Sequence, residues 1–273
     1  MLSKFVIGAG SPKINRPTGP IYDTDAQAFF TAVQADGSVL TTTQKSGINT
    51  LVTDLKTAGL WTKTIALYPF IGGIASTHKW NLKDPRDLDA AYRLVFVGSP
   101  VHSSTGVAWN GTTQYANTFL LANTMGQNNV HISYYSRINA DLSSLDMGAE
   151  NGTAWCLRFA LNFSNGTYVE TNAGGGTVGG LFPSTMGYFM STRILSTEYN
   201  AYRNGSLHAT KVDEVRSPEA TSIYIGGSNN TGTPRYGSRD CSFSSIGSGL
   251  TSTEAANQYT AIQAYQTSLG RQL

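Results

Sequence analysis

The sequence predicts a mainly β protein: an antiparallel β-sandwich with an N-terminal helical hairpin and a C-terminal helix. Short runs rich in β-branched and aromatic residues recur after residue 64, with turn residues between them. One run, residues 154–163, alternates with a period of two, which gives it an apolar face and a mixed face. Helical spacing of apolar residues is found near the two ends of the 273-residue chain. Many short strands with few intervening helices favour a sandwich.

We expect three regions along the chain. Residues 1–22 are rich in proline and glycine, which favours an extended arm without a core of its own. Residues 23–70 contain two stretches whose apolar residues recur at i, i+3, i+4 and i+7, the pattern of a helical hairpin. Residues 71–273 are expected to form the sandwich and its closing helix.

The expected helix ends follow from capping residues. Asp23 or Thr24 is the expected N-cap of the first helix, and Gly59 should end the second. Thr251 and Glu254 match a capping box at the start of the last helix.

The expected strands share β-rich composition and flanking turn residues. They are residues 64–70, 92–98, 114–120, 130–137, 154–163, 167–171, 187–195, 198–203, 221–227 and 240–247.

Four Asn-Gly dipeptides mark the turns between strands. They begin at Asn110, Asn151, Asn165 and Asn204, and a following Ser or Thr makes each an N-glycosylation match as well. The apolar run at residues 5–7 is too short for the core of a secretory signal peptide, so we expect no export. These sites are therefore interpreted as turns, because Asn-Gly adopts the positive φ angles of a tight hairpin.

Composition excludes several classes of partner. Charged residues make up 13% of the chain, about half of the ~25% usual for soluble domains, and the net charge is +2 without a basic run. Neither nucleic acid nor a membrane is therefore expected as a partner, and no apolar run reaches the length of a membrane helix. Cys156 and Cys241 are expected to be free, buried thiols.

Several segments resemble a known fold family. GVAWNGTTQYANTFL (106–120) and EYNAYRNGSLHAT (198–210) resemble paired strands of concanavalin A-like and laminin-G-like jelly rolls. TSIYIGG (221–227) and FSSIGSGLTSTEAANQYTAIQAYQ (243–266) resemble the closing strands and terminal helix of that fold. The resemblance covers roughly residues 92–270 and implies a concanavalin A-like sandwich.

The wider arrangement resembles virion proteins of phages and prophages that infect Bacteroidetes-type hosts. The relevant segments are DTDAQAFF (23–30), residues 48–73 and HKWNLKDPRDLDAAYRLVF (78–96), followed by the jelly roll. This resemblance implies a non-enzymatic structural or adhesion protein of the virion, at the head or in tail fibres. Its implied partners are other virion proteins, further copies of itself in a homo-oligomer such as a trimer, and host-surface glycans.

An arm that lies along a neighbouring subunit would place apolar residues in an interface. Phe5, Ile7 and Ile14 are the expected contacts in the arm, and Trp80 is a candidate aromatic anchor. Trp80 lies in the charged segment 78–93, for which a local ion-pair and capping network is the alternative interpretation.

The expected glycan-binding residues lie beside turns. Sugar sites stack a pyranose face on an aromatic ring and bind hydroxyl groups with Asn or Arg. Tyr199, Tyr202, Arg203, Asn204 and Tyr236 have that chemistry, although strand alternation must direct some of them into the core.

A carbohydrate-active module, either a lectin, a polysaccharide lyase or a glycosidase, is the alternative function. Glu170 and Glu198 lie in strand-like stretches without the carboxylate partner at i+2 or i+4 that a glycosidase would need on one face. A lyase would use Tyr135 with His131, or Arg158, although packing roles are the simpler interpretation for such residues.

No cofactor or metal is expected. The Gly-x-Gly-x-x-Gly match at residues 174–179 precedes a strand-like run, so it predicts a loop rather than a dinucleotide site. Asp141, Asp146 and Glu150 lie in one loop and could supply Ca²⁺ ligands, but a solvated acidic loop fits their spacing better.

Overall fold

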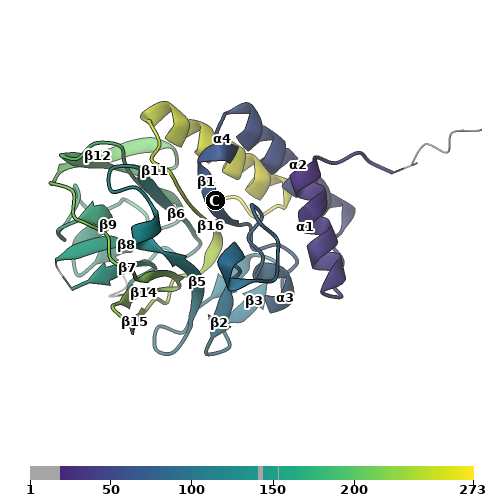
Figure 1. Cartoon of the computed structure of the whole chain (residues 1–273), viewed down its shortest axis with the longest axis horizontal. Coiled ribbons are helices and arrows are strands. Elements are labelled where there is room, and N and C mark those ends of the chain that lie inside the picture. The colour runs from purple at the N-terminus through teal and green to yellow at the C-terminus, as the bar shows by residue number, and fades with distance from the viewer. Residues whose placement is uncertain (1–18, 141–143, 153) are drawn as a thin grey trace, which may run out of the picture.

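The protein is a β-sandwich with a layer of helices over one sheet. The computed structural model describes residues 19–140, 144–152 and 154–273. Phe5, Ile7 and Ile14 lie outside the described residues, so their interface role stays a prediction. In Figure 1 the long helices cover one side of the molecule, and β7, β8 and β9 lie on the other.

One sheet, which we call the inner sheet, has all of its strand pairs antiparallel. Its strand order is β12–β11–β10–β6–β16–β4–β3, and β1 also pairs with β16. The strands are β1 (Thr64–Tyr68), β3 (Val101–Ser103), β4 (Gly106–Ala108), β6 (Val130–Ser136), β10 (Gly187–Arg193), β11 (Glu198–Arg203), β12 (Ser206–Val212) and β16 (Cys241–Gly247).

The second sheet, the outer sheet, is antiparallel except for the pair β7–β14, which is parallel. Six of its strands follow the order β15–β14–β7–β13–β5–β2. The other two lie off this path: β8 pairs with β7, and β9 pairs with β8. The strands are β2 (Val95–Val97), β5 (Tyr115–Leu121), β7 (Met147–Asn151), β8 (Trp155–Phe163), β9 (Gly166–Ala173), β13 (Ser222–Ile225), β14 (Gly227–Asn230) and β15 (Thr233–Tyr236).

The helices begin where the sequence predicts. The Asp23 side chain caps α1, and Thr251 with Glu254 forms the capping box of α4. None of the helices in the described residues is long and apolar enough to cross a membrane. The helices are α1 (Thr24–Ala35), α2 (Thr42–Thr57), α3 (Ala75–His78) and α4 (Ser252–Ser268), with 3₁₀ turns η1 (Trp61–Lys63), η2 (Asp89–Ala91) and η3 (Ala122–Thr124).

Strand alternation gives the inner sheet two buried faces. Tyr134 and Phe189 belong to the core between the sheets, whereas Tyr135 and Met190, one residue further along each strand, belong to the core beneath α1, α2 and α4. Neither amphipathic helix of the hairpin could bury its apolar stripe alone. The helices are therefore a third layer of the same sandwich.

Two details of the chain differ from the expected boundaries. The strand expected at residues 64–70 is present as β1, and because β1 pairs with β16 in the inner sheet, the sandwich begins before residue 71. The strands β7, β14 and β15 were not expected, because MGAEN, GSNN and TPRY are too polar or too interrupted to carry a strand pattern.

The turn at Asn204 is a two-residue hairpin loop, as predicted. Asn204 and Gly205 have φ angles of 48° and 73°, and they join β11 to β12. Near Asn165 the turn is shifted by one residue: Ser164 and Asn165 have the positive φ angles, and Gly166 already begins β9. Cys156 and Cys241 are free and buried, which confirms the expectation of free, buried thiols.

Candidate functional site

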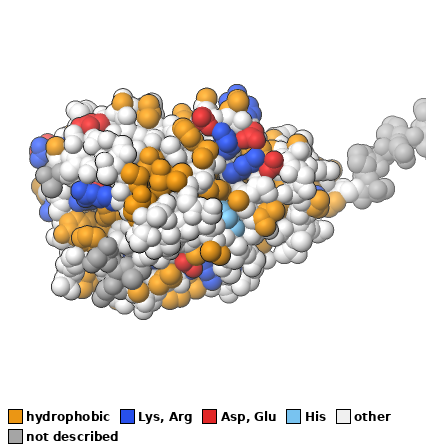
Figure 2. All heavy atoms as spheres, turned by 90° about the horizontal axis from the view of Figure 1, so that it is seen from below, with side chains coloured by type: hydrophobic (Ala, Val, Ile, Leu, Met, Phe, Trp, Pro, Cys, Tyr) orange, Lys and Arg blue, Asp and Glu red, His pale blue; other side chains and the backbone are white. Residues whose placement is uncertain are grey.

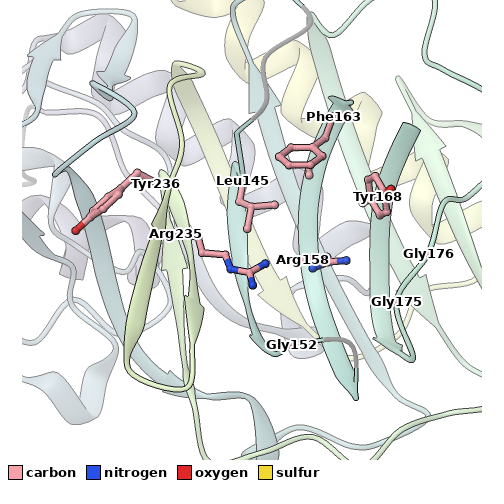
Figure 3. Close-up of a pocket in the computed structure, with 10 residues that line it drawn as sticks. Leu145, Gly152, Arg158, Phe163, Tyr168, Gly175, Gly176, Arg235 and Tyr236 are labelled. Carbon is pink, nitrogen blue, oxygen red and sulfur yellow. The ribbon is translucent and has the colours of Figure 1, made fainter. Parts of the chain in front are cut away.

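A cavity of about 620 Å³ lies on the outer sheet. It opens on the face directed away from the inner sheet, because Arg158 and Tyr168 line it while their neighbours Phe159 and Val169 belong to the core between the sheets. Figure 3 shows its lining. The lining residues are Leu145, Gly152, Arg158, Ala160, Phe163, Tyr168, Gly175, Gly176, Arg235 and Tyr236.

Strand register explains why the sheet is hollowed here. Arg235 pairs with Ser228, Ser228 with Gly148, and Gly148 with Arg158, so these residues form one row across β15, β14, β7 and β8. Glu170 of β9 completes the row opposite Arg158. The two central residues are small, which leaves space between the two arginines. Gly148 has a φ of 148°, and a Cβ there would overlap the backbone of β8, so only glycine fits.

Two buried glutamates hold the arginine at the centre of the cavity. Arg158 Nε donates to Glu170 Oε2 at 2.5 Å, and Arg158 Nη1 donates to Glu150 Oε2. Arg235 Nη1 donates to the same Glu150 oxygen at 3.4 Å. Both glutamates are completely buried, whereas 45% of the Arg235 side chain is exposed. The carboxylates therefore lie beside Arg158 on the same face of the sheet, covered by neighbouring groups and absent from the cavity lining.

Burial also changes the pKa of one glutamate in this cluster. Desolvation raises the pKa of Glu170 to about 7, although the Arg158 guanidinium acts in the opposite direction. The second oxygen of each glutamate, Oε1, is buried and has no hydrogen-bond partner among the described residues. Among those residues the cavity lining holds two arginines and no acidic side chain.

Two aromatic rings form the other wall of the cavity. Phe163 and Tyr168 come from the two sides of the β8–β9 turn, and their ring centroids are 6.0 Å apart with planes at 88°. The Arg158 guanidinium carbon lies 5.4 Å from the Tyr168 ring centroid. Both rings are half-buried, so each keeps part of its surface open. In Figure 3 Arg235 extends from β15 toward Arg158, with Phe163 and Tyr168 further across the sheet.

The glycine-rich segment forms one rim of the cavity. Residues 174–180 are a loop between β9 and β10, as predicted, and Gly175 and Gly176 line the cavity. A Cβ on Gly176 would lie 3.9 Å from Lys211 Nζ, which places an ammonium group beside this rim.

Tyr199 and Tyr202 do not reach this cavity. They are 1% and 2% exposed, respectively. Tyr199 is in the core between the sheets, while Tyr202 lies beneath α4, where its hydroxyl is 2.9 Å from Ser252 Oγ. Neither ring has an open face for a sugar, because the second sheet and the helices cover the two faces of β11.

Arg203 and Asn204 stabilise the hairpin that carries them. Arg203 Nη2 donates to the Met186 carbonyl at 3.0 Å, and Asn204 Oδ1 accepts the backbone N–H of Tyr188 at 2.8 Å. Neither residue lines the cavity. These side chains therefore serve local structure here.

Tyr236 is the one expected ligand-binding residue among the cavity lining. Its ring nevertheless points away from Arg235 in Figure 3. The ring centroid lies 6.3 Å from that of Tyr115, which stacks on Tyr224 with centroids 4.3 Å apart. Tyr236 thus contributes the edge of the cavity and belongs to a neighbouring tyrosine cluster.

Trp80 lies in the core of this chain. It is 4% exposed beneath the helices, and the Lys79 ammonium lies 4.5 Å from its ring centroid. Lys79 also pairs with Asp87 at 3.0 Å, and Asp87 with Arg93 at 3.0 Å. The local ion-pair interpretation of this segment describes what is found, and the buried ring offers no surface to a partner.

The acidic residues considered for Ca²⁺ do not converge. Asp146 is completely buried and accepts from Arg239 Nη1 at 2.7 and 2.8 Å, while Glu150 accepts from Arg158. Asp141 lies outside the described residues. Within those residues no group of three or more His, Cys, Asp and Glu side chains is placed to hold a metal ion.

Sequence reasoning missed most of the cavity. Arg158 was recognised on the mixed face of its strand, but strict alternation placed Phe163 on the apolar face, and a register shift between Ala160 and Phe163 brings it to the cavity instead. Leu145, Tyr168 and Arg235 were not considered. The available signal was the pair of aromatic residues that flank the turn at residues 164–165. Arg235 could not be found in this way, because a parallel strand pair brings it to the site.

Solved structures resemble this chain in fold. A mutant sialidase of Trypanosoma rangeli that displays trans-sialidase activity has a TM-score of 0.52, and the same organism's sialidase bound to a difluorinated nononic acid has 0.50. Each is 11% identical over 79% of this chain and 39% of the sialidase chain. Domain 4 of an arabinanase from Geobacillus stearothermophilus, bound to arabinotriose, is 12% identical over 72% of this chain and 98% of that domain, with a TM-score of 0.39.

These comparisons establish the fold class only. The chain spans well under half the length of the sialidases it resembles, and the identities are too low to transfer an activity. No family model matches the chain, and no curated protein matches it in sequence.

Proposed function

We propose that this protein binds carbohydrate in the cavity of the outer sheet. The observation that carries the proposal is the half-buried pair Phe163 and Tyr168 beside the guanidinium groups of Arg158 and Arg235. An aromatic ring can stack on the apolar face of a pyranose, and guanidinium groups donate hydrogen bonds to its oxygens. Charged residues make up only 13% of the chain, and on the face in Figure 2 most side chains are neither acidic nor basic, which suits a polar ligand such as a glycan.

We infer binding without cleavage. Most glycosidases use two carboxyl groups that flank the scissile bond. Glu150 and Glu170 contact the cavity residue Arg158, yet both are completely buried and both accept hydrogen bonds from Arg158. Their geometry supports a role in holding Arg158.

The test is a glycan array followed by calorimetry on the full chain. Tyr168→Ala should lower the affinity for a bound glycan about tenfold, since it removes roughly one buried apolar face. Tyr259→Ala is the matched control, because Tyr259 is a half-buried tyrosine of α4 that packs against Tyr188, away from the cavity lining. Equal losses in the two variants, or the absence of any bound glycan, would contradict the proposal.

The sequence resemblance to virion proteins suggests where such binding would be used. In that setting the cavity would attach a particle to host-surface glycans, and the chain would assemble with itself. The measurement is the oligomeric state in solution by light scattering. A stable trimer or another closed oligomer supports the virion role, while a monomer that degrades a bacterial polysaccharide would contradict it.

A further inference from the structure

We propose that the cavity selects acidic glycans, with the sugar carboxylate bound between Arg158 and Arg235. This inference depends on the proposed carbohydrate function and names the ligand class for the same cavity. Its basis is that the guanidinium groups of Arg158 and Arg235 both donate to the same oxygen of Glu150.

One carboxylate oxygen brings the two guanidinium groups together. Arg158 Nη1 and Arg235 Nη1 both donate to Glu150 Oε2, so each arginine lies one hydrogen bond from the same atom. Glu150 is completely buried beside Arg158 on the same face of the sheet, and it therefore holds the two arginines together without lining the cavity. Ser228 and Gly148 separate the two arginines in the row and leave the intervening space unfilled by side chains.

Both arginines keep donors for a ligand. Within the described residues, Arg158 Nη2 and Arg235 Nη2 donate to no protein acceptor, and neither atom is among the buried unpaired nitrogens. A carboxylate is planar and accepts two parallel N–H···O bonds, which matches the fork of a guanidinium group. A neutral sugar hydroxyl has one oxygen and no charge, so it would form weaker hydrogen bonds with these donors and could not form the bidentate pair.

The charge around the cavity also favours an anion. Its lining contains Arg158 and Arg235 and no acidic side chain among the described residues, while Lys211 Nζ lies beside the rim at Gly176. The compensating carboxylates of Glu150 and Glu170 are completely buried and do not line the cavity. Burial raises the pKa of Glu170, whereas the Arg158 guanidinium lowers it.

The aromatic wall fits the rest of such a ligand. An acidic sugar has an apolar ring face and a charged substituent on the same ring. Phe163 and Tyr168 supply the apolar surface, and Arg158 lies 5.4 Å from the Tyr168 ring centroid. One residue of an acidic glycan could therefore use both walls at once.

Two matched ligand pairs test the proposal by calorimetry: oligogalacturonate with its methyl ester, and sialyllactose with lactose. The wild-type protein should bind at least one acidic member about tenfold more tightly than its neutral partner, since a charge-assisted hydrogen bond is lost with the charge. Arg235→Gln should lower the affinity for that acidic ligand about tenfold and the affinity for its neutral partner by a clearly smaller factor, because only the acidic ligand loses a charge-assisted hydrogen bond.

Arg86→Gln is the matched control, because Arg86 is an exposed arginine paired with Asp84 on the loop before η2. It should leave both affinities unchanged. If neutral and acidic partners bind equally, or Arg235→Gln affects both alike, the acidic specificity is wrong while the carbohydrate function stands. If no glycan of either kind binds, the proposed function fails as well.

Discussion

Among the residues that the structure describes, two buried arginines are paired with carboxylates, and of these Arg158 lines a cavity whereas Arg239 does not. Arg239 is completely buried; its Nη1 donates to Asp146 and its Nη2 donates to the carbonyls of Ala140 and Leu161. Arg158 donates to Glu150 and Glu170 and still has a nitrogen open to the cavity. An arginine–carboxylate pair thus stabilises the fold at the enclosed Arg239 site, whereas the same kind of pair leaves a donor for a ligand at the open Arg158 site.

The enclosed pair should show the largest effect on stability. Arg239→Met leaves the Asp146 carboxylate buried without its cation and should lower the free energy of unfolding by about 3–5 kcal/mol. Urea denaturation followed by circular dichroism measures this. A loss below about 1 kcal/mol would mean that water reaches Asp146, so that the Arg239 site is not more enclosed than the Arg158 site.

The cavity-facing arginine should have an intermediate effect. Arg158→Met should lower the free energy of unfolding by about 2–3 kcal/mol at pH 7. The loss should shrink at pH 5, because burial raises the pKa of Glu170 to about 7 and protonation at lower pH removes the buried charge that Arg158 compensates. A loss as large as that of Arg239→Met, unchanged between the two pH values, would contradict the contrast.

A buried group without a charged partner extends the comparison to the inner sheet. Burial lowers the pKa of His131 from 6.5 to about 4, and its Nδ1 lies 2.6 Å from the Ser248 carbonyl oxygen. His131 therefore binds a proton below about pH 6.5 in the unfolded chain, but only below about pH 4 in the folded protein. Stability should fall by about 2 kcal/mol from His131 alone as the pH drops from 7 to 5.

The measurement is the free energy of unfolding across that pH range, with His131→Gln as the comparison. His78 has its pKa lowered by burial in the same direction, so the variant should retain part of the slope. An unchanged slope in His131→Gln would show that His131 is not the group responsible.

The exposed arginine should have the smallest effect on stability. Arg235 makes one long ion pair to Glu150 at 3.4 Å, and Glu150 keeps Arg158 as its partner when Arg235 is replaced. Arg235→Gln should lower the free energy of unfolding by less than about 1 kcal/mol. Thermal unfolding checks this, and a larger loss would place Arg235 with the structural arginines.

Local sequence rules predicted the elements whose causes are local. The capping residues Asp23, Thr251 and Glu254, the period-two pattern of residues 154–163 and the hairpin turn at Asn204 all depend on neighbours within a few positions. A turn or a helix end is decided by backbone angles and nearby hydrogen bonds, so the sequence alone was sufficient.

The tertiary structure decided which faces were covered. Tyr199 and Tyr202 appeared available for sugars until a second sheet and a helix layer were found on the two sides of β11. The cavity itself depends on strands distant in the chain, since the parallel pairing of β7 and β14 brings Arg235 to the Glu150 that also holds Arg158. The sequence alone thus determined the strands, helix caps and hairpin turn, whereas the long-range register of the outer sheet determined the site.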